Sequence, residues 1–107
     1  MTVGQLLSLI DSSIENTYPD EVKIQWIRDV DGRVLSDIHN IPPDKIELPQ
    51  GENDVLAVPD SYSKAYLLYI RAMIDFFSGI YTGYSNRYHE YESTLLMYAK
   101  YRIRNRE

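Results

Sequence analysis

Apolar residues recur at spacings of three and four along most of this chain, which is the period of an α-helix. Near the N-terminus, Thr2 and Gln5 have the spacing of a capping box, in which each residue satisfies a backbone N–H of the first helical turn. One apolar stripe follows at the helical period: Val3, Leu6, Leu7, Ile10 and Ile14. The pattern predicts a short amphipathic helix from about Thr2 to Glu15.

A second helix is predicted from Thr17, which can cap it, to the region of Asn40. Its first turn holds a proline and two acids that suit the helix dipole: Pro19, Asp20 and Glu21. Its apolar positions keep the helical period until Pro42–Pro43: Trp26, Ile27, Val30, Val34 and Ile38. Asp31–Gly32 is also a hairpin signal. We favour helix there, because the period is unbroken on both sides and one internal glycine costs only about 1 kcal/mol.

Between residues 45 and 58 the helical period is lost. The short segments Lys45–Leu48 and Asp54–Val58 flank Pro49–Asn53, which is rich in turn-forming residues. We expect a small two-stranded β-hairpin, which would be marginally stable unless it packs against helices.

The main helix is predicted to open at Pro59–Asp60, with Asp60 as its N-cap. Apolar residues occupy most of its circumference: Tyr62, Tyr66, Leu67, Tyr69, Ile70, Met73, Ile74, Phe76, Phe77 and Ile80. Its polar residues form only a narrow strip: Lys64, Arg71, Asp75 and Ser78. A helix with so little polar surface needs partners on more than one side.

A final helix is predicted to run to about Arg104. Gly79 and Gly83 separate it from the main helix, and Ser85 or Asn86 can cap it. The two helices are predicted to form an antiparallel hairpin. We expect its core to hold Tyr66, Met73, Tyr84 and Tyr88.

Tyrosine is concentrated in this C-terminal region, because nine of the ten tyrosines lie between Tyr62 and Tyr101. One stripe of the final helix combines Tyr84, Tyr88, Tyr91, Leu95 and Tyr98. A tyrosine ring buries like an apolar side chain while its hydroxyl keeps a polar partner, so such stripes suit surfaces that another protein covers. The pattern points to assembly before catalysis.

These elements predict a mainly α fold: a small helical bundle of about four helices, with a long C-terminal antiparallel helical hairpin and a short β-hairpin between helices two and three. A length of 107 residues predicts one domain, spanning residues 1–107. With 44% hydrophobic and 25% charged residues, the composition is that of a globular protein. The absence of cysteine excludes disulfides, thiolate metal sites and cysteine nucleophiles.

Charge is divided unevenly along the chain. Residues 1–60 hold four Lys/Arg and twelve Asp/Glu, a net charge of −8, and residues 61–107 hold seven and four, a net charge of +3. A nucleic-acid backbone repels such a chain as a whole. The longest apolar run, Ala65–Ile70, is far shorter than a membrane span, and no signal-peptide pattern precedes it, so we expect no membrane association and a cytoplasmic location.

Motifs for chemistry are weak. Ser61 and Lys64 satisfy the S-x-x-K pattern of serine acyl-enzymes, but the accompanying motifs are absent, and a polar first turn of helix explains them better. His39 and His89 lack the spacing of a metal site. We therefore expect no enzyme activity, no catalytic residue, no metal and no cofactor.

A dense basic cluster ends the chain: Lys100, Arg102, Arg104 and Arg106. On a helix Lys100 and Arg104 share one side and Arg102 and Arg106 another, so the cluster forms a collar around the helix. Cations in the last turn of a helix interact favourably with the helix dipole and stabilise the helix by roughly 0.3 to 1 kcal/mol. A further role is equally open, and an acidic protein surface suits the collar better than DNA.

Two stretches resemble the head-tail connector (adaptor, or head-completion) proteins of tailed bacteriophages and prophages. The first runs from Trp26–Ile27 to Gly32–Arg33–Val34, and the second comprises Ile74–Asp75, Gly79, Tyr81, Tyr84 and Asn86 with the tyrosine-rich helix that follows. The resemblance covers the chain from the second helix to its end, and it rests on packing and turn residues. It departs from the family's pattern at Ile80 and Ser85–Asn86.

The resemblance implies a structural subunit of the virion neck that is assembled in the host cytoplasm. Copies would form a homo-oligomeric ring on the portal protein, extend the DNA channel and offer a surface to downstream neck or tail proteins. DNA would pass without sequence-specific binding. Within this interpretation we place subunit or portal contacts at Tyr91, Tyr98, Lys100, Arg102, Arg104 and Arg106.

The alternative is a small helical regulatory or nucleic-acid-binding module that uses the basic C-terminal helix. Duplex binding at low salt, lost when Arg102, Arg104 and Arg106 become Ala, would favour this alternative.

Overall fold

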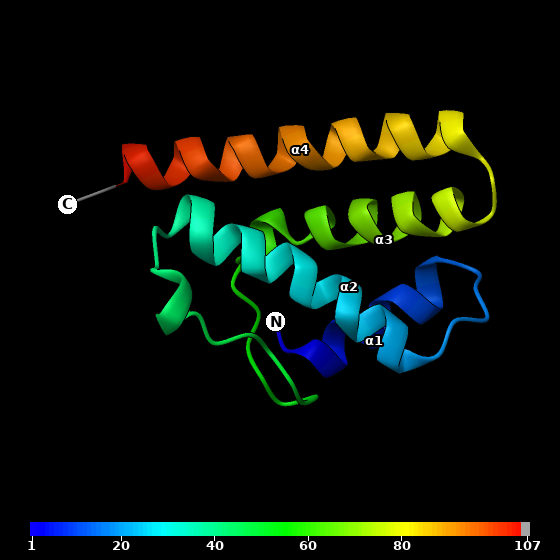
Figure 1. Cartoon of the computed structure of the whole chain (residues 1–107), viewed down its shortest axis with the longest axis horizontal. Helices are drawn as coiled ribbons and strands as arrows, with labels where there is room; N and C mark the ends of the chain where they lie inside the picture. The colour runs from blue at the N-terminus through cyan, green and yellow to red at the C-terminus, as the bar shows by residue number, and fades with distance from the viewer. Residues whose placement is uncertain (106–107) are drawn as a thin grey trace. The chain divides into compact units, whose positions relative to one another are not determined.

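The computed structural model describes residues 1–105 and is mainly helical (Figure 1). Its helices follow in the order α1 (Val3–Ser13), α2 (Asp20–Arg33), η1 (Val34–Ile38), η2 (Pro43–Lys45), η3 (Asp60–Tyr62), α3 (Lys64–Phe77) and α4 (Tyr81–Arg104). Of the short elements, η1 is a π-helical turn, and η2 and η3 are 3₁₀ turns. The prediction of a mainly α fold with about four helices is confirmed.

The chain divides into two compact units. We term Met1–Asp60 the N-terminal unit and the part from Ser61 onward the C-terminal unit. The boundary coincides with the division of charge in the sequence, so the N-terminal unit carries −8 and the C-terminal unit +3. That both units fold as one domain over residues 1–107 stays a prediction.

Helix α1 begins with the predicted capping box. The backbone N–H of Gln5 donates to Thr2 Oγ1 at 3.2 Å, and the Thr2 N–H donates to Gln5 Oε1 at 2.9 Å. The predicted apolar stripe is buried: Val3, Leu6, Leu7, Ile10 and Ile14. The helix ends at Ser13, slightly before the predicted end, because Ile14 is extended.

Helix α2 starts at Asp20 with Pro19 as its N-cap, so the prediction that Thr17 caps it is wrong. The backbone is still extended at Pro19, with ψ at 157°, which delays the first helical turn. The helix continues through Asp31–Gly32 into η1, which confirms helix over the hairpin signal. Helical structure ends at Ile38, close to the predicted end.

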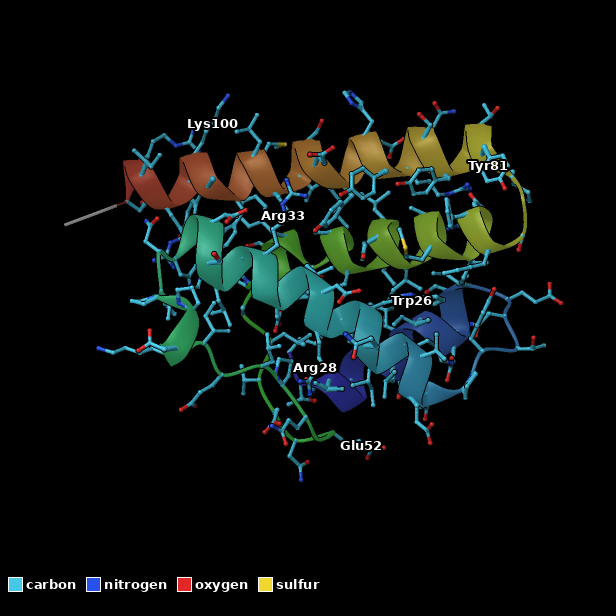
Figure 2. All side chains as sticks on the ribbon, viewed as in Figure 1. Trp26, Arg28, Arg33, Glu52, Tyr81 and Lys100 are labelled. Atoms are coloured by element: carbon cyan, nitrogen blue, oxygen red, sulfur yellow. The ribbon has the colours of Figure 1, made fainter. Side chains whose placement is uncertain are left out.

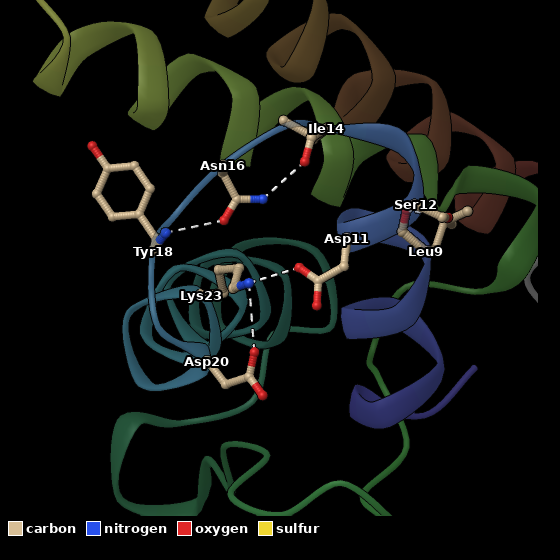
Figure 3. A network of polar contacts seen from close by, with 8 residues as sticks. All are labelled: Leu9, Asp11, Ser12, Ile14, Asn16, Tyr18, Asp20 and Lys23. Atoms are coloured by element: carbon tan, nitrogen blue, oxygen red, sulfur yellow. Dashed lines mark hydrogen bonds and ion pairs between the residues drawn. The ribbon is translucent and has the colours of Figure 1, made fainter.

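A buried lysine joins the first two helices. Lys23 is only 3% exposed, and its Nζ donates to Asp11 Oδ1 at 2.7 Å and lies 3.5 Å from Asp20 Oδ1 (Figure 3). Figure 3 shows the two carboxylates reaching this ammonium from α1 and from the first turn of α2. The pairing compensates for the removal of the Lys23 charge from water.

The predicted β-hairpin of Lys45–Leu48 and Asp54–Val58 is wrong. Residues 1–105 contain no strand, and the single isolated bridge of this region joins Val55 to Thr2. Two carbonyls at the junction of the predicted turn and the second segment accept instead from the first N–H groups of α1: Val3 N donates to Asp54 O at 2.9 Å, and Gly4 N donates to Glu52 O at 2.9 Å. The free N–H donors of a helix N-terminus therefore hold this part of the chain against α1, where a hairpin partner was predicted.

The predicted Asp60 cap of the main helix is also wrong. Asp60 lies in η3, and α3 begins at Lys64 with Ser63 as its N-cap. The Asp60 carboxylate accepts instead from the backbone nitrogen of Met1 at 2.8 Å. The Asp60 carboxylate is therefore occupied by the charged amino group of Met1 and does not cap the helix.

The turn of the C-terminal hairpin is tighter than predicted. Helix α3 ends at Phe77, and Gly79 adopts a φ of +77°, which favours glycine. Helix α4 begins at Tyr81, so Gly83 lies inside its first turn, and the prediction of a cap at Ser85 or Asn86 is wrong. A Cβ on Gly83 would lie 2.6 Å from a carboxylate oxygen of Asp75, so glycine permits the close approach of the two helices.

An aromatic seam joins α3 to α4, which run antiparallel as predicted (Figure 1). The ring of Tyr69 lies 5.0 Å from that of Tyr91, and the ring of Tyr62, in η3 just before α3, lies 5.4 Å from that of Tyr98. Near the turn, an ion pair between Asp75 and Arg87 adds a second link.

The expected core residues differ in their burial. Tyr66 is fully buried, whereas Met73, Tyr84 and Tyr88 are half-buried. Tyr84 and Tyr88 nevertheless belong to the seam, with rings 5.2 Å from Phe76 and 6.3 Å from Tyr69 respectively. The predicted stripe of α4 is therefore the face that packs on α3.

Candidate interaction surface

Exposed large apolar side chains gather in the C-terminal unit. Of nine such side chains among the residues described, eight lie on α3, α4 or the turn between them, and Val55 is the ninth. Scattered exposed apolar side chains are ordinary on a protein surface, but a concentration on one element indicates an interaction site.

The first group caps the turn between α3 and α4 and is termed the tip cluster: Phe76, Phe77, Ile80 and Tyr81. Phe77 is 62% exposed and Tyr81 65% exposed. The Phe76 ring lies 5.3 Å from the Phe77 ring and 5.9 Å from the Tyr81 ring, so the exposed rings form one contiguous cluster. Figure 2 shows Tyr81 at the start of α4, beside the turn.

The second group occupies the second half of α4: Leu96, Met97, Tyr101 and Ile103. These residues form two stripes, because Leu96, Lys100 and Ile103 share one flank and Met97, Tyr101 and Arg104 share another. Both flanks lie beside the tyrosine stripe that packs on α3, and on the second flank the Tyr101 ring lies 5.8 Å from that of Tyr62. In each stripe a cation stands beside apolar residues, which suits a partner that offers apolar groups and carboxylates.

A groove opens between α3 and α4 and is termed the α3–α4 groove. It holds about 380 Å³ and is lined by Lys64, Leu67, Leu68, Arg71, Glu90, Ser93, Thr94 and Met97. Leu67 and Leu68 are half-buried, and Met97 is 56% exposed, so the groove presents apolar surface to solvent. Lys64 and Arg71 outnumber the single carboxylate of Glu90, which gives the rim a net positive charge.

The predicted contact residues fall into two classes. Tyr91 and Tyr98 are 2% and 3% exposed and belong to the seam with α3, so their rings have little area to give to a partner. Lys100, Arg102 and Arg104 are exposed, and Figure 2 shows Lys100 pointing away from α3. Arg102 also donates to the Tyr98 hydroxyl at 3.4 Å. Arg106 lies outside the described residues. A contact role for all six residues stays a prediction.

Sequence reasoning missed Leu96, Met97 and Ile103 as surface residues. A signal was present, because all three lie outside the stripe formed by Tyr84, Tyr91 and Tyr98. Apolar residues on the flanks of a well-defined apolar stripe predict a second contact surface.

The N-terminal unit contributes one acidic segment, residues 44–55, which we term the acidic loop. It carries four carboxylates and one lysine: Asp44, Glu47, Glu52, Asp54 and Lys45. All five side chains are exposed, and Val55 at the end of the loop is 73% exposed. Figure 2 shows Glu52 at the outer edge of this loop. The loop therefore combines negative charge with one exposed apolar side chain.

The acidic loop is ordered by its own aspartate. The backbone N–H groups of Gly51 and Gln50 donate to Asp54 Oδ2 at 2.9 and 2.7 Å. These bonds, that of Gly51 first, hold the pKa of the Asp54 carboxyl below its usual value of 3.8. Asp54 therefore stays ionised at any physiological pH.

The residues that the sequence suggested for catalysis or metal binding lie on separate elements. Ser61 is exposed in η3, Lys64 is exposed at the start of α3, and His89 is exposed on α4. Residues 1–105 contain no group of three or more His, Cys, Asp or Glu side chains that could hold a metal ion. Over the same range, no helix is both long and apolar enough to cross a membrane.

Comparisons of the chain with protein-family models, with curated proteins and with solved structures found no match. The resemblance to head-tail connectors therefore rests on the residues quoted for it.

Proposed function

We propose that this chain is a structural assembly subunit, and specifically a head-tail connector that forms a ring on a phage portal. The observation that carries the proposal is the exposed apolar surface of the C-terminal hairpin: the tip cluster, together with the two stripes of α4. A folded chain gains nothing from leaving eight large apolar side chains in water, whereas an assembled chain can cover them.

The charge of the chain supports the same function. A net charge of −5 keeps a phosphate backbone at a distance, so DNA can move past such a subunit without adhering to it. The more specific parts of the proposal, namely the ring, the portal and the virion neck, rest on the resemblance of the quoted stretches to connector proteins. Lys100 and Arg104 are exposed on α4 and offer positive charge to an acidic partner surface.

Light scattering over a concentration series, with and without purified portal protein, tests this proposal. Negative-stain images of the same samples should show rings, or extra density on the portal. A chain that stays monomeric and does not bind the portal at any concentration would count against a connector. A monomer in the absence of portal alone is compatible with a ring that closes on its template.

A matched pair of variants sharpens the test. Phe77→Ser with Ile80→Ser removes exposed apolar area from the tip cluster, and Ser85→Ala changes an exposed polar residue of the same hairpin. The tip variant should lose assembly or portal binding while its thermal unfolding midpoint stays close to that of the parent. Ser85→Ala should keep both properties.

The alternative of a nucleic-acid-binding module makes a different prediction. Duplex DNA should then bind at low salt, and binding should disappear when Arg102, Arg104 and Arg106 are all replaced by Ala. The connector proposal expects little duplex binding by the parent chain.

A further inference from the structure

We infer that copies of this chain bind head to tail, with the acidic loop of one copy seated in the α3–α4 groove of the next. The inference rests on the proposed function, because it specifies the contact that would build the ring.

The two surfaces match in apolar character. Val55 is the one large apolar side chain of the N-terminal unit that is exposed among the residues described, and it lies at the end of the acidic loop. The apolar part of the α3–α4 groove lining is Leu67, Leu68 and Met97, and its volume of about 380 Å³ has room for a valine side chain. Burial of Val55 in that groove would remove its apolar surface from water.

The two surfaces also match in charge. Four carboxylates and one lysine give the acidic loop a net charge of −3. The groove carries Lys64 and Arg71 on α3 against Glu90 on α4, and its Met97 stripe continues to Arg104. Carboxylates of the loop can therefore pair with cations on both sides of the apolar contact, which fixes its orientation.

The charge of whole units favours the same arrangement. Two N-terminal units at −8 repel each other, and two C-terminal units at +3 do so more weakly. Contact between unlike units is the arrangement that electrostatics favours. Such a contact is heterologous, so each copy keeps a free loop and a free groove, and repetition of the contact produces a ring or a filament.

Disulfide trapping tests the inference directly, because the parent chain contains no cysteine. Val55→Cys and Met97→Cys, combined in one chain that we term the trapping variant, should give a ladder of dimers, trimers and higher species under mild oxidation. The matched control combines Val55→Cys with Leu96→Cys. Leu96 and Met97 are adjacent and equally exposed at 56%, but Leu96 lies outside the groove. The control should give no ladder.

A charge swap provides an independent arm. Lys64→Glu with Arg71→Glu, added to the trapping variant, should abolish the ladder by placing carboxylates opposite carboxylates. Further addition of Glu47→Lys and Glu52→Lys should restore the ladder. Asp54 is left unchanged, because it orders the loop.

Each result decides the inference. A ladder specific to residue 97 and rescued by the swap supports it. Equal trapping at residues 96 and 97, dimers alone, or a disulfide closed within one chain overturns it. Light scattering on the same samples separates this inference from the proposed function: oligomers without the specific ladder contradict the loop contact only, and a chain that stays monomeric even with portal contradicts both.

Discussion

The two units of this chain treat apolar surface in opposite ways. The N-terminal unit buries its apolar stripes and, within the described residues, exposes one large apolar side chain, Val55. The C-terminal unit uses one face of α4 to bind α3 and still exposes eight. The hairpin therefore carries more apolar side chains than its own packing buries, since the seam of tyrosines already joins the two helices.

Two adjacent leucines of α4 give the largest expected difference in stability between a buried and an exposed apolar side chain. Leu95 is 3% exposed and Leu96 is 56% exposed. Leu95→Ala should lower the free energy of unfolding by about 2 to 5 kcal/mol, because it leaves a cavity in the hairpin core. Leu96→Ala should change it by less than about 0.5 kcal/mol, because its side chain is already in water.

Urea unfolding of both variants, compared by midpoint at equal slope, measures the difference. Similar losses in the two variants would mean that Leu96 is covered in the folded chain, and the contrast between the two units would disappear.

The buried lysine of the N-terminal unit gives the next largest effect. Asp11→Asn removes the closer carboxylate of Lys23, at 2.7 Å, and leaves the ammonium with Asp20 at 3.5 Å. The side chain of Asp11 is 55% exposed, so solvent screens part of the pairing, and a loss on the order of 1 to 2 kcal/mol is expected.

Asp20→Asn is the matched control and should cost less in the same urea experiment, because its oxygen lies farther from Lys23. A larger loss for Asp20→Asn than for Asp11→Asn would reverse the assigned roles of the two carboxylates.

The helical period predicted most of the fold. It located all four α-helices, carried α2 through Asp31–Gly32 and identified the face of α4 that packs on α3. Local patterns failed where a distant group competed for the same atoms. Residues 49–58 resemble the turn and second arm of a hairpin in sequence, but the carbonyls of Glu52 and Asp54 accept from the first turn of α1. Asp60 resembles an N-cap, but it accepts from Met1.

The candidate surface was predicted less completely than the fold. The excess of apolar residues on the C-terminal helices was visible in the sequence, but the sequence assigned contacts to Tyr91 and Tyr98, which the fold buries. A tyrosine stripe suits a core and an interface equally well, because each ring is apolar with one polar end. Only the packing of α3 on α4 separates Tyr91 and Tyr98 from the exposed Leu96, Met97 and Ile103.

A smaller effect is expected at the N-terminus of α1. Thr2→Ala removes the side-chain acceptor of the Gln5 N–H and should lower the free energy of unfolding by about 1 kcal/mol. Thr2→Ser keeps the hydroxyl and should restore most of this loss. Because the carbonyls of Asp54 and Glu52 satisfy the N–H groups of Val3 and Gly4, the helix itself should persist in the alanine variant, as circular dichroism can verify.

The smallest effect on stability is expected from the ionisation of Asp54, one of the carboxylates that make the N-terminal unit acidic. The N–H groups of Gly51 and Gln50 hold the pKa of this carboxyl below 3.8, so the folded loop binds its proton less tightly than the unfolded chain does. The ordering contribution of Asp54 is therefore complete above the usual aspartate pKa and is lost as pH falls through the lowered value.

Asp54→Asn should abolish the low-pH titration seen by NMR at residue 54 and speed the exchange of the Gln50 and Gly51 amide protons at neutral pH. Glu52→Gln, which removes a carboxylate of the same loop without touching those amides, should leave their exchange unchanged. An unchanged exchange rate in Asp54→Asn would show that the loop is ordered by its backbone bonds to α1 alone. In that case the acidic loop would bring only its charge and Val55 to a partner, and its shape would come from the helix that it caps.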